Sequence, residues 1–208
     1  MLLVDTLCEA NYLSNTYILG NDKECLIIDP SNDIRSIKKL VNNRKVLGIF
    51  LTHGHFDHFK SLENTIKEFN TKVFLQKNAL EKLKNPNISC SNMFGYNTTI
   101  DLLKEQYQVI NDGQKIVLND LTIKVLATPG HTNCSICLII EDMMFSGDTL
   151  FECGVGRSDL PTGSSMQLSK SIQMLLNLKT DYIVYPGHGD KTSIFSEVKI
   201  NPYYQRIK

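Results

Sequence analysis

Short apolar runs, each ended by polar or turn-forming residues, are the feature of this sequence that most restricts its fold. Nine such runs have four to six residues, are rich in Val, Ile and Leu, and are bounded by Asp, Asn, Gly or Pro. This pattern is typical of buried β-strands. We therefore expect strands over residues 15–19, 25–28, 46–51, 72–75, 107–110, 121–126, 135–140, 143–146 and 182–185.

Amphipathic stretches between these runs predict helices over residues 33–41, 58–69, about 78–83 and 165–178. The last helix has the clearest pattern, because Ser164 can cap it and Gln167 completes a capping box. Four of its apolar residues fall on one face: Leu168, Ile172, Leu175 and Leu176. Residues 85–99 contain four Asn, one Pro and one Gly and predict a long surface loop.

The order of these elements indicates an α/β protein. Strands come both as adjacent pairs and separated by helices, which favours two mixed β-sheets flanked by helices over one doubly wound parallel sheet. At 208 residues the chain has the length of one domain. We expect a single domain spanning residues 1–208.

The composition argues against several classes of function. Lys plus Arg and Asp plus Glu both number 22, so the chain lacks the basic excess typical of proteins that bind nucleic acid or anionic membranes. The sequence contains no run of about 18 apolar residues, so it predicts no transmembrane helix. The N-terminal residues lack the pattern of a signal peptide. We expect a cytoplasmic protein whose six scattered cysteines are reduced thiols.

The histidines are few and are placed unusually. Only five occur, and three of them form a His-x-His-x-Asp-His hexapeptide from His53 to His58. The other two, His131 and His188, each follow a Pro-Gly pair. All five come shortly after a predicted strand, as do Asp29 and Asp148. Side chains at strand ends are held by a rigid scaffold and still reach an open rim.

These residue types predict a metal site. Imidazole and carboxylate suit zinc, iron and related ions. Seven candidate ligands are too many for one tetrahedral ion and suit two ions that share a carboxylate, with open positions for water and substrate. The seven are His53, His55, Asp57, His58, His131, Asp148 and His188.

Each candidate also has an ordinary structural explanation. A single Pro-Gly-His is more often a turn, Asp57 can be a helix N-cap, and Asp148 can cap a turn. A closed structural zinc site is a further alternative, although such sites are usually rich in Cys.

The Cys134-x-x-Cys137 pair lacks a partner pair and lies at the start of a predicted strand. Because residues i and i+3 of a strand point to opposite faces, we expect these cysteines to fill the core.

Five longer motifs resemble the metallo-β-lactamase superfamily, and within it the small bacterial hydrolases of the glyoxalase II (hydroxyacylglutathione hydrolase) type. They are residues 52–58 (THGHFDH), 128–132 (TPGHT), 145–151 (FSGDTLF), 156–161 (GRSDLP) and 185–189 (YPGHG). Thr192, Glu197, Asn201 and Pro202 resemble the C-terminal part of that subfamily. The resemblance implies an αββα sandwich with a metal site at one edge.

The resemblance also implies a role for each candidate. His53, His55 and His131 would hold the first ion, while Asp57, His58 and His188 would hold the second. Asp148 would bridge both ions, Asp29 would support the ligands, and Asp57 would also orient the nucleophile or pass a proton. The chain departs from the pattern at Asn133-Cys134, where Pro-Gly is frequent, and it ends about 20 residues after His188, before the helical domain that supplies glutathione contacts in full-length enzymes.

Substrate contacts are predicted outside the ligand set. Arg157 lies in a glycine-rich loop shortly after Asp148 and is our candidate for binding an anionic substrate; the alternatives are a solvated Arg and an ion pair with Asp159. Met93, Phe94 and Tyr96 either line the substrate groove or anchor the loop that carries them.

The expected activity is thioester hydrolysis by a hydroxide held between two divalent ions, zinc first, with iron or manganese as alternatives. The main alternative is an oxidoreductase like the persulfide dioxygenases, in which two His and one Asp hold a single iron. A nuclease and a non-catalytic metal-binding module are further alternatives. A true β-lactamase is less expected, because those enzymes usually lack the aspartate found here as Asp148. We expect a small-molecule substrate, no nucleic-acid or membrane partner, and a monomer or small homo-oligomer.

Overall fold

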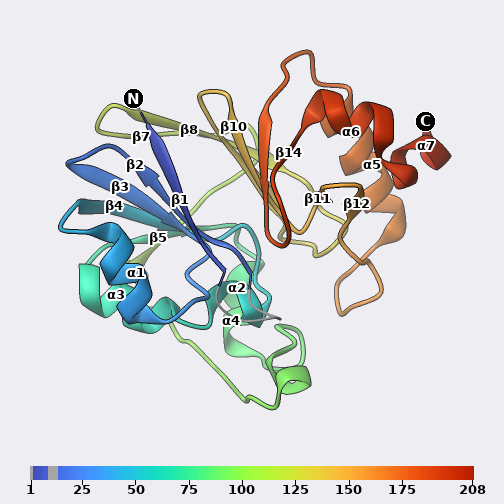
Figure 1. The fold of residues 1–208 in the computed structure, drawn as a ribbon. Coiled ribbons are helices and arrows are strands. Elements are labelled where there is room, and N and C mark those ends of the chain that lie inside the picture. Colours follow the sequence, from blue (N-terminus) through green and yellow to red (C-terminus); the bar gives the residue numbers. More distant parts are fainter. Residues whose placement is uncertain (1, 9–13) are drawn as a thin grey trace. The chain divides into compact units, whose positions relative to one another are not determined.

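The computed structural model describes residues 2–8 and 14–208. The chain divides into two compact units, Met1–Ile110 and Asn111–Lys208. Each unit contains one six-stranded mixed sheet with helices beside it (Figure 1). The prediction of an α/β protein with two mixed sheets is confirmed. The single domain over residues 1–208 stays a prediction.

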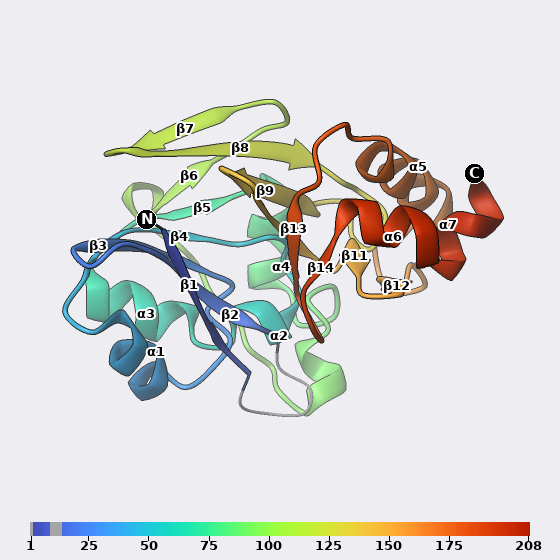
Figure 2. The ribbon, with the colours of Figure 1, turned by 45° about the horizontal axis from the view of Figure 1, so that its top comes forward.

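The first unit builds its sheet in chain order. Its strands are β1 (Leu3–Leu7), β2 (Thr16–Gly20), β3 (Glu24–Ile28), β4 (Lys45–Phe50), β5 (Val73–Leu75) and β6 (Tyr107–Val109). Strand β2 runs antiparallel to its neighbours β1 and β3, and β3 to β6 run parallel. The α-helices of this unit are α1 (Ile34–Val41), α2 (Phe56–Phe59), α3 (Leu62–Phe69) and α4 (Ala79–Lys84). Helices α1 and α3 lie along the same face of the sheet (Figures 1 and 2).

The second unit forms its sheet in the order β14-β13-β10-β9-β8-β7. The strands are β7 (Lys115–Leu118), β8 (Leu121–Ala127), β9 (Ile136–Ile140), β10 (Met143–Gly147), β13 (Ile183–Pro186) and β14 (Thr192–Ser193). A separate hairpin contains β11 (Leu150–Phe151) and β12 (Gly154–Val155). The helices are α5 (Ser165–Leu176), α6 (Ile194–Ile200) and α7 (Pro202–Ile207).

Strand direction explains why polar residues gather at one edge of each sheet. In the first unit β3 and β4 are parallel neighbours, so Asp29 and His53 follow strands that end at the same edge. In the second unit β8 and β10 both run antiparallel to β9, and β13 runs parallel to β10. His131, Asp148 and His188 therefore also follow strand ends at one edge.

Helix α5 confirms its predicted apolar face. Leu168, Ile172, Leu175 and Leu176 are buried in one hydrophobic cluster with residues of β9, β10 and β13. Burial of each such side chain contributes roughly 1.5–3 kcal/mol. The Ser164 hydroxyl accepts a hydrogen bond from the Gln167 N–H and caps the helix as predicted.

The helix predicted over residues 58–69 is wrong as one continuous element, because it is two helices, α2 and α3. A continuous helix would join the Ser61 N–H to the Asp57 carbonyl. Instead Ser61 donates to the carbonyl of Pro30, and the Asp57 carbonyl accepts from the Ser14 N–H. Contacts distant in sequence thus replace the helical hydrogen bond, and neighbouring residues alone do not reveal them.

Several short elements were not predicted: strands β1, β7, β11, β12 and β14, and helices α6 and α7. All five strands have only two to five residues and leave part of their side chains incompletely buried, so their sequences carry a weak apolar signal. Within residues 85–99 the structure has one short 3₁₀ turn, Ser91–Phe94.

Among the described residues, no helix is long and apolar enough to cross a membrane.

The cysteines behave as predicted. All six lie among the described residues and are reduced thiols. Cys134 and Cys137 are both buried, and burial raises the pKa of the Cys137 thiol to about 12. The Cys-x-x-Cys pair therefore fills the core of the second unit.

Candidate metal centre

The first unit brings four predicted ligands together. His53 and His55 lie in the turn that follows β4, and Asp57 and His58 lie in α2. The His53 ring centroid is 4.9 Å from that of His55 and 4.1 Å from that of His58. The Nε2 atom of His58 is 3.9 Å from Asp57 Oδ2. The N-cap of α2 is His55, so the alternative explanation of Asp57 as a helix cap is wrong.

Asp29 orients one of these imidazoles. Its Oδ2 atom lies 2.8 Å from His58 Nδ1, and both side chains are buried. The carboxylate also accepts hydrogen bonds from the Thr52 N–H (2.8 Å) and the Thr52 hydroxyl (2.6 Å). When Nδ1–H donates to the carboxylate, the neutral ring presents the lone pair of Nε2, the arrangement that metal-binding histidines use.

Thr52 also reaches a second histidine. Its Oγ1 lies 3.2 Å from His53 Nδ1 while its own hydroxyl proton points to Asp29. A hydrogen bond from His53 Nδ1–H to this oxygen would leave Nε2 of His53 as the available ring nitrogen. The sequence motif that contains Thr52 does not reveal these hydroxyl contacts.

The second unit brings the other three predicted ligands together. Oδ2 of Asp148 lies 3.4 Å from His131 Nε2 and 3.6 Å from His188 Nε2. These separations exceed ordinary hydrogen-bond lengths. Two atoms bound to one tetrahedral ion at about 2.1 Å lie about 3.4 Å apart. One carboxylate oxygen therefore stands at ligand spacing from two imidazoles.

The main chain after β12 supports His131. Its Nδ1 donates to the carbonyl oxygen of Arg157 over 2.7 Å, which leaves Nε2 for a metal. Gly156 passes so close that a Cβ atom there would lie 1.9 Å from the Asp148 carbonyl oxygen and 3.1 Å from His131 Nδ1. This role of the Arg157 carbonyl was not predicted, since a main-chain contact leaves little trace in the sequence.

The Arg157 side chain forms the ion pair that was the alternative to substrate binding. Its Nε and Nη2 atoms each lie 2.7 Å from an oxygen of Asp159. These hydrogen bonds lower the pKa of the Asp159 carboxyl to about 2. Both side chains are exposed. Binding of an anionic substrate by Arg157 stays a prediction.

Phe94 and Tyr96 anchor their loop through Phe56, which stands between the predicted ligands His55 and Asp57. The Phe56 ring centroid lies 4.9 Å from that of Tyr96 and 6.0 Å from that of Phe94. Met93 is 63% exposed. The loop-anchoring explanation therefore holds for the two aromatic residues.

The residues present fit a metal centre. In each unit the ligand atoms are imidazole nitrogens and carboxylate oxygens, which suit divalent zinc, iron or manganese. His58 and His131 have their Nδ1 atoms engaged by oxygen acceptors, which orients Nε2. Cysteine, the usual ligand of closed structural zinc sites, takes no part in either group.

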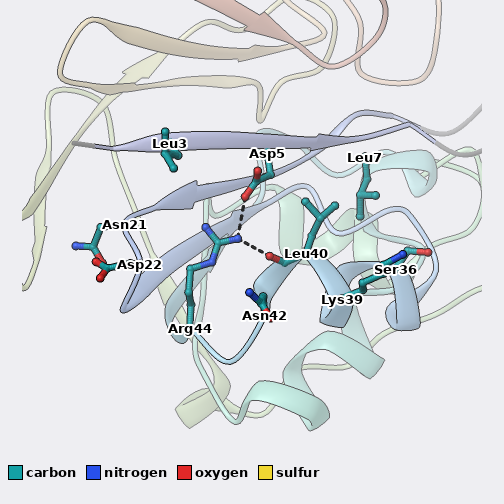
Figure 3. A pocket seen from close by; sticks show the side chains of 10 residues that line it. All are labelled: Leu3, Asp5, Leu7, Asn21, Asp22, Ser36, Lys39, Leu40, Asn42 and Arg44. Atoms are coloured by element: carbon teal, nitrogen blue, oxygen red, sulfur yellow. Dashed lines mark hydrogen bonds and ion pairs between the residues drawn. The ribbon is translucent and has the colours of Figure 1, made fainter.

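A separate cavity of about 690 Å³ lies in the first unit between β1 and α1. Leu3, Asp5 and Leu7 line it from the strand (Figure 3). Arg44 in this cavity lies 2.8 Å from Asp5 and also donates to the carbonyl of Leu40. None of the predicted ligands lines this cavity.

Comparison with known proteins identifies the family. The model of the metallo-beta-lactamase superfamily matches residues 10–188. The chain belongs to this superfamily. It is 32% identical over 196 residues to the probable metallo-hydrolase YqgX of Bacillus subtilis, covering 91% of this chain and 92% of YqgX.

Solved structures of the superfamily share the fold. BLEG-1, described as a B3 metallo-beta-lactamase, is 30% identical, with a TM-score of 0.91 over 97% of this chain and 99% of BLEG-1. TTHA1623, solved in a di-iron-bound form, is 26% identical, with a TM-score of 0.84 over 97% of this chain and 99% of its own. The predicted metallo-β-lactamase fold is confirmed, and the relatives indicate a metallo-hydrolase.

Proposed function

We propose that the two ligand groups form one binuclear metal centre and that this superfamily member hydrolyses thioesters in the manner of glyoxalase II. The observation that carries the proposal is the spacing around Asp148, whose Oδ2 lies 3.4 and 3.6 Å from two imidazole nitrogens. The match to the superfamily model spans all seven predicted ligands. TTHA1623, with its two irons, supports a centre of two ions.

The residues divide between the two ions as the motifs imply. His53, His55 and His131 would hold one ion, Asp57, His58 and His188 the other, and Asp148 both. Two divalent cations supply a lowered pKa for a water molecule and polarisation of an acyl carbonyl when they are bound. Zinc is the proposed metal, with iron and manganese as alternatives.

The protein's own groups complete the proposed reaction. Asp57, whose Oδ2 lies 3.9 Å from Nε2 of His58, orients the attacking water or accepts its proton. Asp29 keeps the His58 ring oriented throughout. The thiol leaves as a thiolate and needs little protonation, so neither a Ser nor a Cys nucleophile is required. Arg157 binds a negatively charged group of the substrate, and this ion pair replaces the one between Arg157 and Asp159.

A thioester panel tests the proposal. Purified protein is assayed with thioesters of several acyl groups and thiols, glutathione among them, before and after removal of metal with a chelator. We expect turnover that chelation abolishes and added divalent metal restores. We also expect metal-loaded Asp57→Asn to lose about 10²-fold or more in kcat. Thioester turnover that is unchanged in the metal-free protein would contradict the mechanism.

Hydrolysis of β-lactams is a second candidate, favoured by the 30% identity to BLEG-1. A β-lactam ring is a strained amide, and its opening also requires an activated water and a polarised carbonyl. A chromogenic cephalosporin assayed beside the thioesters compares the two activities. A kcat/KM at least tenfold higher for the thioester supports our first proposal, and the reverse ratio supports the second.

We place the protein in the cytoplasm, acting on a small molecule as a monomer or small homo-oligomer, without a nucleic-acid or membrane partner.

A further inference from the structure

The hairpin β11–β12 and the residues directly before and after it contact all three predicted ligands of the second unit. Asp148 lies two residues before Leu150, the first residue of β11. The Phe151 ring meets the His188 ring edge-on, with centroids 6.2 Å apart. Directly after β12, Gly156 packs on the Asp148 carbonyl and the Arg157 carbonyl accepts from His131. A shift of this hairpin would therefore displace every ligand of the group.

The turn of this hairpin is held by a buried carboxylate from the C-terminal helices. Glu197 in α6 is fully buried. Its two oxygens accept from the Cys153 N–H, at 3.2 Å and 3.1 Å. Oε1 also accepts from the Thr192 hydroxyl at 2.7 Å. Cys153 has a positive φ of 54°, a conformation that a non-glycine residue keeps only when its surroundings hold it.

Asn201 completes this anchor. Its Nδ2 donates to Glu197 Oε2 at 2.7 Å and to the Gly154 carbonyl at 3.1 Å. Its Oδ1 accepts from the N–H groups of Tyr203 and Tyr204 and caps α7. Asn201 therefore links the hairpin to the start of the last helix, and two consecutive hairpin residues, Cys153 and Gly154, are bonded to one buried pair.

We propose that Glu197 and Asn201 are positioning residues for the metal centre: they fix the β11–β12 hairpin and thereby set the metal affinity of the ligands His131, Asp148 and His188. This inference rests on the proposed metal centre and is independent of which substrate is hydrolysed. It gives α6 and α7 a function beyond completing the core of the second unit.

The test is the Glu197→Gln variant. Its amide group would turn an N–H donor toward Thr192, Cys153 or Asn201, all of which already donate to this site. Removal of groups that orient metal ligands typically costs 10–100-fold in metal affinity. We expect zinc affinity, measured by competition with a chromophoric chelator, to fall at least about tenfold. The visible absorption bands of the Co²⁺-loaded protein should also shift, and amide hydrogen exchange should accelerate over residues 150–157.

Two further variants sharpen the experiment. Glu152→Gln makes the same chemical change on the same hairpin, at an exposed residue beside Cys153, and should keep wild-type zinc affinity within about twofold. Thr192→Val removes one donor and leaves Glu197 bonded to Cys153 and Asn201. It should fold even if Glu197→Gln does not, and it should lower zinc affinity by about threefold.

The outcomes separate this inference from the proposed function. Wild-type zinc affinity and an unchanged Co²⁺ spectrum in both Glu197→Gln and Thr192→Val would overturn the positioning role, even if both variants melt at lower temperature. A wild-type protein that binds two metal ions and hydrolyses no thioester would overturn the proposed activity alone. A wild-type protein that binds neither zinc nor cobalt would overturn both.

Discussion

Asp29 Oδ2 lies 2.8 Å from Nδ1 of His58, and the same carboxylate is hydrogen-bonded to Thr52 beside His53. One buried acidic side chain thus supports two neighbouring imidazoles of the first ligand group. Asp29 follows β3 and His53 follows β4, which are parallel neighbours in the sheet. The scaffold therefore brings the supporting residue and the ligands to the same edge.

Replacement of Asp29 should weaken metal binding. In Asp29→Asn the side chain keeps an acceptor for Thr52, but it loses the charge and one of the two oxygens that now face His58 and Thr52. We expect a 10–100-fold loss of zinc affinity, measured by chelator competition.

Asp33→Asn is the matched control for this variant. Asp33 is the N-cap of α1, is exposed and accepts from the Arg35 N–H. Because Asn caps helices as well as Asp does, this change should leave zinc affinity unaltered. Equal zinc affinity in the Asp29 and Asp33 variants would contradict the supporting role of Asp29.

Two glycines of the β11–β12 segment should differ sharply in their tolerance of alanine. A Cβ on Gly156 would lie 1.9 Å from the main-chain oxygen of Asp148, so the backbone would have to move and carry a predicted ligand with it. A Cβ on Gly154 would come no closer than 3.7 Å to its neighbours. We expect Gly156→Ala to lose zinc affinity by more than about tenfold, and Gly154→Ala to remain near wild type. Similar zinc affinities for the two variants would argue against the close approach seen here.

The sequence predicted much of the fold because its central strands are short, apolar and ended by turn residues. All nine predicted strands are present, and each strand end lies within one residue of its predicted position. Three of the four edge strands, β1, β7 and β14, and the β11–β12 hairpin were missed because most of their side chains are only partly buried and lack a continuous apolar signal.

The residues of the candidate site could also be predicted only in part. Candidate ligands could be named because His and Asp side chains at strand ends carry a recognisable chemistry. The carbonyl of Arg157, the hydroxyl of Thr52 and the buried carboxylate of Glu197 could not be assigned roles, because these depend on contacts between segments far apart in the chain.

Thiol reactivity checks the packing of the cysteines. Cys8 and Cys153 are exposed, whereas the other four cysteines are buried. Burial raises the pKa of Cys25 to about 11 and that of Cys137 to about 12, so neither forms the reactive thiolate near neutral pH. At pH 8 we expect an aromatic disulfide reagent to modify two thiols per chain rapidly, and all six in denaturant. Rapid modification of four or more thiols in the native protein would contradict the packing.

Arg157 should affect substrate binding more than catalysis. Arg157→Ala removes the guanidinium but keeps the carbonyl that accepts from His131, so metal content should not change. We expect KM for an anionic thioester to rise about tenfold with kcat within about twofold. Asp159→Asn, which removes the negative charge paired with the guanidinium, should lower KM. An uncharged thioester serves as the control substrate, and equal KM changes for both substrates would assign Arg157 a structural role.

The number of metal ions per chain tests the central claim most directly. Elemental analysis of the purified native protein and of Asp148→Ala, with oxygen uptake measured in parallel, covers the iron-dependent alternative as well. The account predicts two divalent ions per wild-type chain, loss of at least one in Asp148→Ala, and thioester hydrolysis without oxygen consumption. One iron per chain with oxygen uptake, or metal content unchanged by the Asp148 substitution, would contradict it.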